Sequence, residues 1–330
     1  MAFVVDSAEW SFDGWTPEEI SLSLDRLLER VNTARKRNEL VWIGDDLQQR
    51  KVLGELNLWE WYLSEERTKL RPEIWQELST WLNSARHYLD QENWPDCITD
   101  TLIQIKDELA QQNVDLAWAH HSTRTGVPTG CISLKRQGLH QTLSSKGEAV
   151  LHWIQTEFSH RNFWRTLIAG ARDETALESL AAHAYPDLHF HTRVWNGIKK
   201  LGGGYLAIRP EINRYLSVLD EHGYWALTFP PPSLDPSDKT IDDKDATPTN
   251  QVLERRFRGL NLVMAPEKPN VYADADCRLA REIRIGEKTL YCEWHGKLEP
   301  HRNRIHIYKP IPESNNKVII AIIDEHLPLP

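Results

Sequence analysis

Residues 290–330 read LYCEWHGKLEPHRNRIHIYKPIPESNNKVIIAIIDEHLPLP, a stretch in which polar and ionisable residues alternate with aliphatic ones. Successive side chains of a β-strand point to opposite faces. Arg304, His306 and Tyr308 are therefore expected on one face of a strand, with Ile305 and Ile307 on the other. The pattern predicts a sheet with one apolar side and one side rich in ionisable groups.

The residues that precede this strand alternate in the same way. Tyr291, Glu293 and His295 are opposed to Cys292 and Trp294. Two neighbouring strands of this kind would gather imidazole, guanidinium, phenol and carboxylate groups on one face of one sheet.

Short strands dominate the end of the chain, and four are expected, at 279–285, 288–294, 304–308 and 317–323. Gly286-Glu287 has the length and composition of a two-residue hairpin turn. The fourth strand is apolar on both faces, so we expect it to be central in the sheet or covered. Successive strands with short links predict an antiparallel meander.

The clearest boundary is FPPPSLDPSDKTIDDKDATPTN, residues 229–250, which has too few apolar groups to offset the entropy of ordering it. We interpret it as a flexible Pro/Asp-rich linker. It would join a helical domain, 1–228, with a possible subdivision near 115–147, to an antiparallel β domain, 251–330. The predicted fold class is α+β, with a large helical N-terminal region followed by a small antiparallel β-sheet domain.

The helical prediction rests on apolar spacing and on start signals. Thr16-Pro17-Glu18-Glu19 combines an N-cap, a first-turn proline and two acidic residues at the positive end of the helix dipole. Further helices are expected at 45–64, 72–90, 98–112, 145–158, 160–171, 173–184 and 209–220.

The charge, the apolar runs and the cysteine spacing of the sequence argue against several classes of protein. The 330 residues carry a formal net charge of −9, which argues against nonspecific duplex binding, but residues 251–330 carry +2 and the remainder −11. We find no signal peptide, and the longest apolar run, 318–323, is too short to cross a bilayer. No CxxC pair occurs among Cys97, Cys131, Cys277 and Cys292, so reduced thiols are expected. We predict a soluble, cytoplasmic protein with no membrane contact.

The polar face near the C-terminus has the groups that RNA cleavage requires. The reaction needs a base for the 2′-hydroxyl, an acid for the 5′-oxygen and cations for the phosphate. We expect His295 and His306 to exchange protons, with Glu293 orienting one imidazole and no cofactor involved. The predicted phosphate- or RNA-binding residues are Arg302, Arg304, Lys297 and Tyr308, of which Tyr308 would stack on a base.

Two other interpretations of these residues stay open. The face could be a solvated surface whose charges pair with one another. Alternatively, His295, His301 and His306 could bind a metal, although their spacing is not i, i+4 and no HExxH motif accompanies them.

Other polar stretches carry weaker signals. His189, His191 and Arg193 alternate within YPDLHFHTRVW and are interpreted as a connection between helices. The Ser/Thr/Gly-rich stretch 120–147 and the glycine triplet 202–204 lack the spacing of a phosphate-binding loop. The role of both loops is left open.

The pattern HRNRIHIY at 301–308, followed by a turn and the apolar strand of KVIIAIIDEH, resembles the second half of RelE/ParE-type toxins. The resemblance covers roughly residues 251–328. It implies a compact antiparallel sheet and, as in members that cleave mRNA at the ribosome, catalytic side chains on one sheet face. By position, Arg302 or Arg304 would match the family's phosphate-contacting arginine, and His306 or Tyr308 its proton-transfer or stacking residue.

Two hypotheses from different classes follow. In the first, the chain is a toxin-like RNA-cleaving or RNA-binding effector of a toxin–antitoxin or phage-defence system, acting as a metal-independent endoribonuclease. In the second, it is a non-catalytic subunit or scaffold of a multiprotein complex. Both expect the acidic helical region to bind a protein partner, and the first expects RNA at the C-terminal domain. The first also requires His295, Arg304 and His306 to converge within about 8 Å.

Overall fold

A computed structural model describes residues 2–90 and 102–330. The chain divides into two compact units, residues up to Phe163 (unit 1) and residues from Trp164 (unit 2). Helices account for 43% and strands for 22%, and each unit contains a mixed sheet. No helix in the described ranges is both long enough and apolar enough to cross a bilayer.

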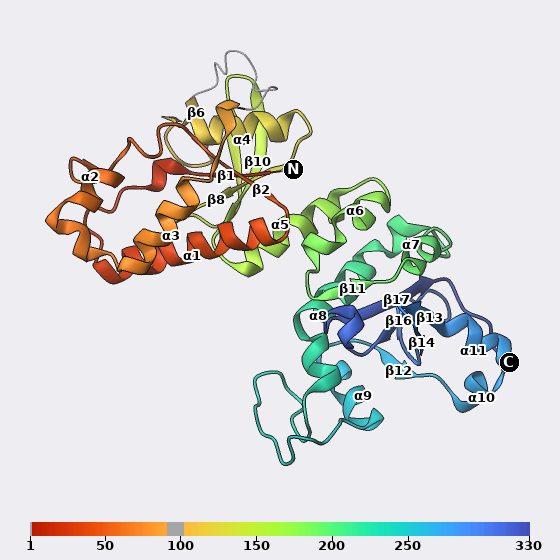
Figure 1. The fold of residues 1–330 in the computed structure, drawn as a ribbon. Helices are drawn as coiled ribbons and strands as arrows, with labels where there is room; N and C mark the ends of the chain where they lie inside the picture. Colours follow the sequence, from red (N-terminus) through yellow and green to blue (C-terminus); the bar gives the residue numbers. More distant parts are fainter. Residues whose placement is uncertain (1, 91–101) are drawn as a thin grey trace. The chain divides into compact units, whose positions relative to one another are not determined.

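Unit 1 is built on an eight-stranded sheet with the order β5-β2-β1-β8-β10-β9-β6-β7. The strands β1, β2, β6, β8 and β10 of this sheet are labelled in Figure 1. The first five strands in this order run parallel, and β9, β6 and β7 extend the sheet by antiparallel pairing. The bounds are β1 Ala2–Val5, β2 Leu40–Ile43, β5 Arg86–His87, β6 Leu102–Ile105, β7 Gln111–Gln112, β8 Thr129–Ile132, β9 Gly138–Ser144 and β10 Gly147–Ile154; a separate small hairpin pairs β3 Lys51–Leu53 with β4 Leu56–Asn57.

Helices cover both faces of this sheet, as a parallel sheet requires. Val4 belongs to a core cluster with Trp118 of α4, whereas its neighbour Phe3 meets the rings of His160 and Phe163 of α5. The helices are α1 Pro17–Lys36, α2 Leu58–Leu63, α3 Pro72–Leu82, α4 Val114–Arg124 and α5 Glu157–Gly170, with 3-10 turns at Ser7–Glu9, Glu65–Lys69 and Tyr88–Asp90.

The predicted start of the first helix is confirmed. Thr16 caps α1 by accepting a hydrogen bond from the backbone N–H of Glu19, and the Glu19 carboxylate accepts one from the backbone N–H of Thr16. This reciprocal capping box satisfies two N–H groups that the helix leaves unpaired.

The prediction of a mainly helical N-terminal region is wrong. The expected helix at 145–158 is largely the strand β10, and the part of 98–112 inside the described residues forms β6 and β7. Residues 45–64 form an α-helix only in α2, and 72–90 only in α3, with a 3-10 turn at 88–90. Short apolar strands such as AFVV and LVWI give no helical or alternating period because both of their faces are buried.

Unit 2 contains a five-stranded sheet with the order β11-β17-β16-β15-β12. β11 runs parallel to β17, and the other neighbours are antiparallel. The strands are β11 Leu188–Phe190, β12 Met264–Pro266, β15 Trp294–Lys297, β16 Arg304–Tyr308 and β17 Val318–Asp324, and β13 Glu282–Ile285 pairs with β14 Lys288–Tyr291 in a separate hairpin.

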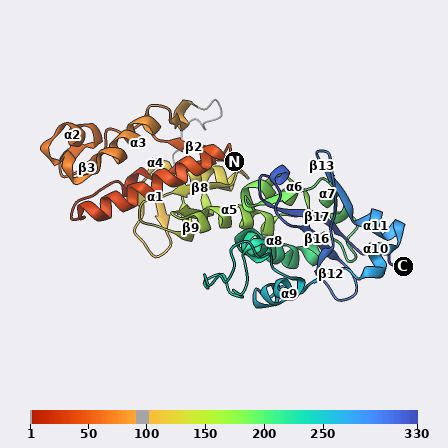
Figure 2. The same cartoon turned by 60° about the horizontal axis from the view of Figure 1, so that its bottom comes forward.

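The helices of unit 2 lie before and between its strands along the chain. They are α6 Thr175–Ala184, α7 Arg193–Ile198, α8 Tyr205–Thr228, α9 Asn250–Gly259, α10 Pro269–Ala273 and α11 Ala275–Arg281, with a 3-10 turn at Pro312–Ser314. In both ribbon views, α10, α11 and the C-terminus lie close together (Figures 1 and 2).

The C-terminal sheet confirms the strand at 304–308 and the antiparallel pairing of β15, β16 and β17. β17 is central and buried on both faces, as its apolar sequence predicts. The hairpin turn at Gly286, which has φ +59°, is also confirmed. However, 288–294 is not one strand. It breaks at Cys292 and Glu293, and its two parts join different sheets.

The segment 229–250 lies inside unit 2, between α8 and α9. The guanidinium of Arg256, on α9, donates to four main-chain carbonyl oxygens, those of Ala226, Phe229, Pro230 and Ser233. The first residues of the segment are therefore tied to the helix that follows it, and both expected boundaries, 228/229 and 250/251, fall within one compact unit.

The cysteines that the structure describes are all free thiols. Cys131, Cys277 and Cys292 are buried and form no disulfide. Cys97 lies outside the described residues.

Candidate functional site

The strand register of unit 2 brings the two expected catalytic histidines together. His295 on β15 pairs with His306 on β16, and Lys297 pairs with Arg304. The imidazole centroids of His295 and His306 are 5.5 Å apart. The alternation predicted for 304–308 therefore does place Arg304 and His306 on the same side of the sheet.

The opposite side of these strands is filled by α8. A Cβ on Gly296 would come 2.5 Å from the Tyr215 ring of α8 and 2.8 Å from Ile305, so Gly296 and Ile305 face that helix. Because neighbouring residues of a strand point to opposite faces, the histidine pair faces away from α8.

On that side the structure contains a cavity of about 440 Å³. Its floor is the polar face of β15 and β16, and its walls come from the segment after β12, from the end of α11 and from the C-terminal residues. It is lined by Ala265, Pro266, Glu267, Lys268, Asn270, Val271, Arg281, His295, Lys297, Arg304, His306, His326, Leu327, Leu329 and Pro330.

The cavity carries an excess of positive charge. Lys268, Arg281, Lys297 and Arg304 line it, whereas Glu267 is the one acidic side chain of the lining. Cationic side chains in a partly enclosed site attract an anion more strongly than they would in open water. The arrangement therefore favours binding of a phosphate or another compact anion.

Two buried arginines are fixed by main-chain oxygens. Arg304 is 8% exposed, and its Nη1 atom donates to the carbonyls of Glu299 at 2.8 Å and Asn303 at 3.1 Å. Arg281 is 2% exposed, and its Nε pairs with Glu267 at 2.6 Å. For Arg304 the bonds found within the described ranges use Nη1 alone, which leaves Nη2 for a ligand.

Burial keeps both imidazoles neutral. It lowers the pKa of His306 well below the usual value for histidine, and the neighbouring His295 adds to this effect. Burial also lowers the pKa of His295, against the opposing effect of Glu267. At pH 7 each ring therefore has one nitrogen with a free lone pair, which is the form that accepts a proton.

Hydrogen bonding selects the basic nitrogen of His306. Its Nδ1 lies 3.4 Å from the carbonyl oxygen of Cys292. A carbonyl oxygen can only accept, so this contact assigns the proton to Nδ1 and leaves Nε2 as the acceptor. On His295, Nδ1 lies 3.5 Å from the Glu267 carboxylate, an ion-pair distance if the ring becomes protonated.

Three residues predicted for the site lie outside this cavity lining. Glu293 sits in the break between β14 and β15, and the carboxylate beside His295 is Glu267 instead. Tyr308 packs against the apolar cluster that contains Leu290 and Cys292. Arg302 has a half-exposed side chain that pairs with Glu299.

His301, the third member of the metal interpretation, also lies outside the lining. It is exposed and has φ +68° in the turn before β16. Within residues 2–90 and 102–330, no group of three or more His, Cys, Asp or Glu side chains is arranged to hold a metal ion.

The ionisable cavity residues that the sequence analysis did not predict include Glu267, Lys268 and Arg281. Arg281 was placed in a strand expected at 279–285 but ends α11, whose N-cap is Asp274. Asp274 followed by an acidic first turn is the local signal that could have identified this helix. Glu267 follows a three-residue strand and has no comparable signal.

The other polar stretches have structural partners. Arg193 donates to the carbonyls of Ala280 and Glu282, and Gly203 and Gly204, with φ +85° and +81°, form the turn before α8. Residues 120–147 contribute the end of α4 and the strands β8 and β9.

The chain matches no protein-family model, no curated protein and no solved structure. The interpretation of the cavity therefore rests on its own geometry.

A second group of ionisable residues lies at the C-terminal ends of the parallel strands of unit 1, where doubly wound sheets bind ligands. Here the carboxylates are bonded internally. Asp115 accepts from the backbone N–H of Ser7 and from the Tyr88 hydroxyl, and Asp6 accepts from Asn113. Burial raises the pKa of Asp115 to about 6. Because these carboxylates are hydrogen-bonded within the protein, we interpret the group as part of the core of unit 1.

Proposed function

We propose that unit 2 binds a phosphodiester of RNA in the cationic cavity and cleaves it without a metal ion. The observation that carries the proposal is the facing pair of His295 and His306 in a cavity lined by four cationic side chains and one carboxylate. The resemblance of the same strands to RelE/ParE-type toxins supports this choice of substrate.

The chemistry uses groups that line the cavity. His306 Nε2 takes the proton of the 2′-hydroxyl, whose oxygen attacks the adjacent phosphorus. The bond from phosphorus to the 5′-oxygen breaks, and a protonated His295 delivers a proton to that oxygen. The products are a 2′,3′-cyclic phosphate and a free 5′-hydroxyl, and no water is consumed.

Charge balance explains how His295 could be protonated when RNA is bound. The pKa of His295 is lowered mainly by burial. A phosphate anion placed beside the ring favours its charged form, and Glu267 at 3.5 Å acts in the same direction. Nη2 of Arg304 and the ammonium group of Lys297 would hold the phosphate oxygens.

Cleavage of a single-stranded RNA in excess chelator tests the proposal. The wild-type chain should yield 5′-hydroxyl and cyclic phosphate ends, and a substrate with 2′-deoxyribose at the cleaved position should stay intact. His306→Asn and Arg304→Lys should lower the rate by about a hundredfold or more, since acid–base catalysis alone contributes about 10²–10⁴-fold. His301→Ala, an exposed histidine outside the cavity, is the matched control.

If excess chelator abolishes cleavage, the reaction depends on a metal ion and the proposed mechanism is wrong. Because His306 and Arg304 are buried, thermal unfolding of each variant must accompany the rate. A folded His306→Asn variant that cleaves RNA at the wild-type rate contradicts the assignment.

The second candidate is a non-catalytic subunit that uses this cavity to hold an anionic group of a partner. The observation in its favour is that His306 is 1% exposed, so little of the ring is open to a substrate in this conformation. Stoichiometric binding of RNA or of a partner protein, with no product after prolonged incubation, would favour this candidate over cleavage.

A further inference from the structure

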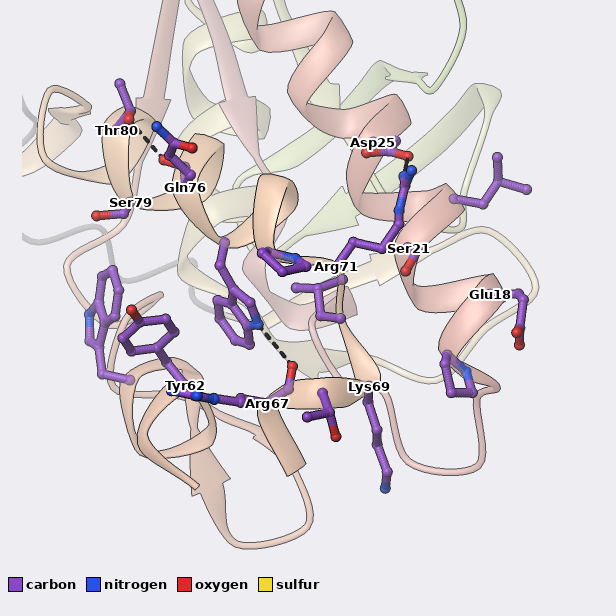
Figure 3. Close-up of a pocket in the computed structure, with 17 residues that line it drawn as sticks. Glu18, Ser21, Asp25, Tyr62, Arg67, Lys69, Arg71, Gln76, Ser79 and Thr80 are labelled. Atoms are coloured by element: carbon purple, nitrogen blue, oxygen red, sulfur yellow. Dashed lines mark hydrogen bonds and ion pairs between the residues drawn. The ribbon is translucent and has the colours of Figure 1, made fainter. Parts of the chain in front are cut away.

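Unit 1 contains a hollow of about 1180 Å³ (Figure 3). One wall is the first part of α1, and the others are α2, the 3-10 turn Glu65–Lys69 and α3. We call it the aromatic groove. It is lined by Pro17, Glu18, Ser21, Leu22, Asp25, Trp59, Tyr62, Arg67, Thr68, Lys69, Leu70, Arg71, Pro72, Trp75, Gln76, Ser79 and Thr80.

Three aromatic side chains form part of its surface. Tyr62 is 41% exposed, and its ring meets the Trp75 ring edge to face at 5.3 Å. The indole N–H of Trp75 donates to the carbonyl of Arg67, and that of Trp59 donates to Gln48. The polar atoms of both indoles are thus satisfied by the protein, so a ligand would meet these residues through their rings.

The cations of the groove come from one short stretch, residues 67–71. Two of them are already paired, Lys69 with Glu66 and Arg71 with Asp25. The guanidinium of Arg67 is exposed and has no ion pair within the described part of the chain. The Trp75 indole donates to the main-chain carbonyl of Arg67, marked by a dashed line in Figure 3, and this bond holds the backbone of Arg67 beside the Trp75 ring.

Two polar groups complete the arrangement. The carboxamide of Gln76, the residue that follows Trp75 on α3, makes no hydrogen bond within the described ranges, although its main-chain carbonyl accepts from Thr80. Glu18, in the first turn of α1, provides a carboxylate on the opposite wall. A side-chain amide can bond the edge of a base, and a carboxylate can accept from a ribose hydroxyl.

We infer that the aromatic groove binds a nucleotide. The base would stack on Tyr62 and its neighbours, the phosphate would pair with Arg67, and Gln76 would contact the base edge. A planar aromatic group joined to an anion matches both the rings and the unpaired guanidinium. A peptide rich in proline would use the rings and leave Arg67 without a partner, so it is the alternative outcome.

This inference does not depend on the function proposed for unit 2, because the groove and the cavity consist of different residues. The nucleotide has two possible sources, a free nucleoside phosphate or one unit of a single-stranded RNA. Both present the same chemistry to the groove.

Titration calorimetry of the full-length chain with adenosine 5′-monophosphate tests the inference. We expect binding of the nucleotide to be at least tenfold tighter than binding of adenosine or of inorganic phosphate alone. Arg67→Ala should weaken it about tenfold or more, and Tyr62→Ala about fivefold or more. Both residues are exposed, and thermal unfolding should confirm that these variants fold.

Arg26→Ala removes an exposed arginine of α1 that does not line the groove, and it should bind the nucleotide as the wild type does. Equal affinity of the wild type, Arg67→Ala and Tyr62→Ala would overturn the inference, as would binding of a proline-rich peptide but not of the nucleotide.

An RNA octamer distinguishes the two sources. If Arg67→Ala weakens binding of the octamer as well as of the monophosphate, the groove takes nucleotides within a strand. If only the monophosphate is affected, it takes free nucleotides. The Arg304→Lys variant, which alters the cavity of unit 2, should still bind the monophosphate as the wild type does. Binding in the groove can therefore be established even if the cavity does not cleave RNA.

Discussion

Replacing Arg256 by methionine tests how the Pro-rich segment is held. The Arg256 side chain is fully buried and stacks over the Trp225 ring at 4.9 Å. Its guanidinium donates to the carbonyls of Ser233 at 2.9 Å, Ala226 at 3.0 Å, Phe229 at 2.8 Å and Pro230 at 3.3 Å. Methionine keeps most of the apolar stem but removes every donor.

Two opposing effects set the expected magnitude. Burial lowers the pKa of Arg256, which shows that the charged form is penalised, and methionine removes that penalty. Against this, each hydrogen bond from a charged donor contributes about 1.5–3 kcal/mol, and the carbonyls left behind would be unpaired. Breaking a buried charged network usually costs about 3–5 kcal/mol, so we expect a loss of this size in the free energy of unfolding of unit 2.

Urea unfolding of the full chain, followed by tryptophan fluorescence, measures the loss. Limited proteolysis supplies a second measure, because release of residues 229–233 should speed cleavage within 229–250. Arg258→Met, an exposed arginine on the same helix, is the control and should change neither. A loss below about 1 kcal/mol with unchanged proteolysis would refute the reasoning.

Three further predictions follow from single contacts. A Cβ on Gly197 would lie 1.9 Å from the carbonyl oxygen of Ile323, so Gly197→Ala should destabilise unit 2 by about 3 kcal/mol or more, and an unchanged melting temperature would contradict this. Burial raises the pKa of Asp115 to about 6, so this residue stabilises unit 1 fully below its unfolded pKa, and the stabilisation is lost as the pH rises through 6. The free energy of unfolding of unit 1 should therefore increase by about 1 kcal/mol from pH 7 to pH 5. Thermal unfolding of Asp115→Asn should show a smaller increase over the same pH range. Because burial lowers the pKa of His306, this base should stay unprotonated and RNA cleavage should not slow from pH 7 to pH 6; a fall in rate with a midpoint near 6.5 would show that the base is an ordinary exposed imidazole.

The strand at 304–308 was predictable because its residues alternate between aliphatic and polar side chains. Arg304 to Tyr308 alternates without interruption and forms the strand with the expected bounds. The same alternation correctly placed His306 and Arg304 on one side. It could not show that the side is enclosed, because the walls come from Glu267, Arg281 and the C-terminal residues, which are brought there by tertiary structure.

The sheet of unit 1 was missed for a physical reason. Ala2–Val5 and Leu40–Ile43 are buried strands of four residues, and their apolar runs have no period that separates strand from helix. Their parallel pairing spans long stretches of sequence and leaves no local turn signal. The capping residue Thr16, by contrast, acts within one helical turn, and the helix that it starts was predicted.

The position of β17 has a consequence for synthesis of the chain. This central strand, Val318–Asp324, pairs with β11 on one side and β16 on the other, so the sheet of unit 2 is in two pieces until residue 324 has left the ribosome. Unit 1 has its strands available much earlier and can fold while the rest is translated. If the cavity cleaves RNA, that activity cannot arise before β17 has been synthesised and has joined the sheet.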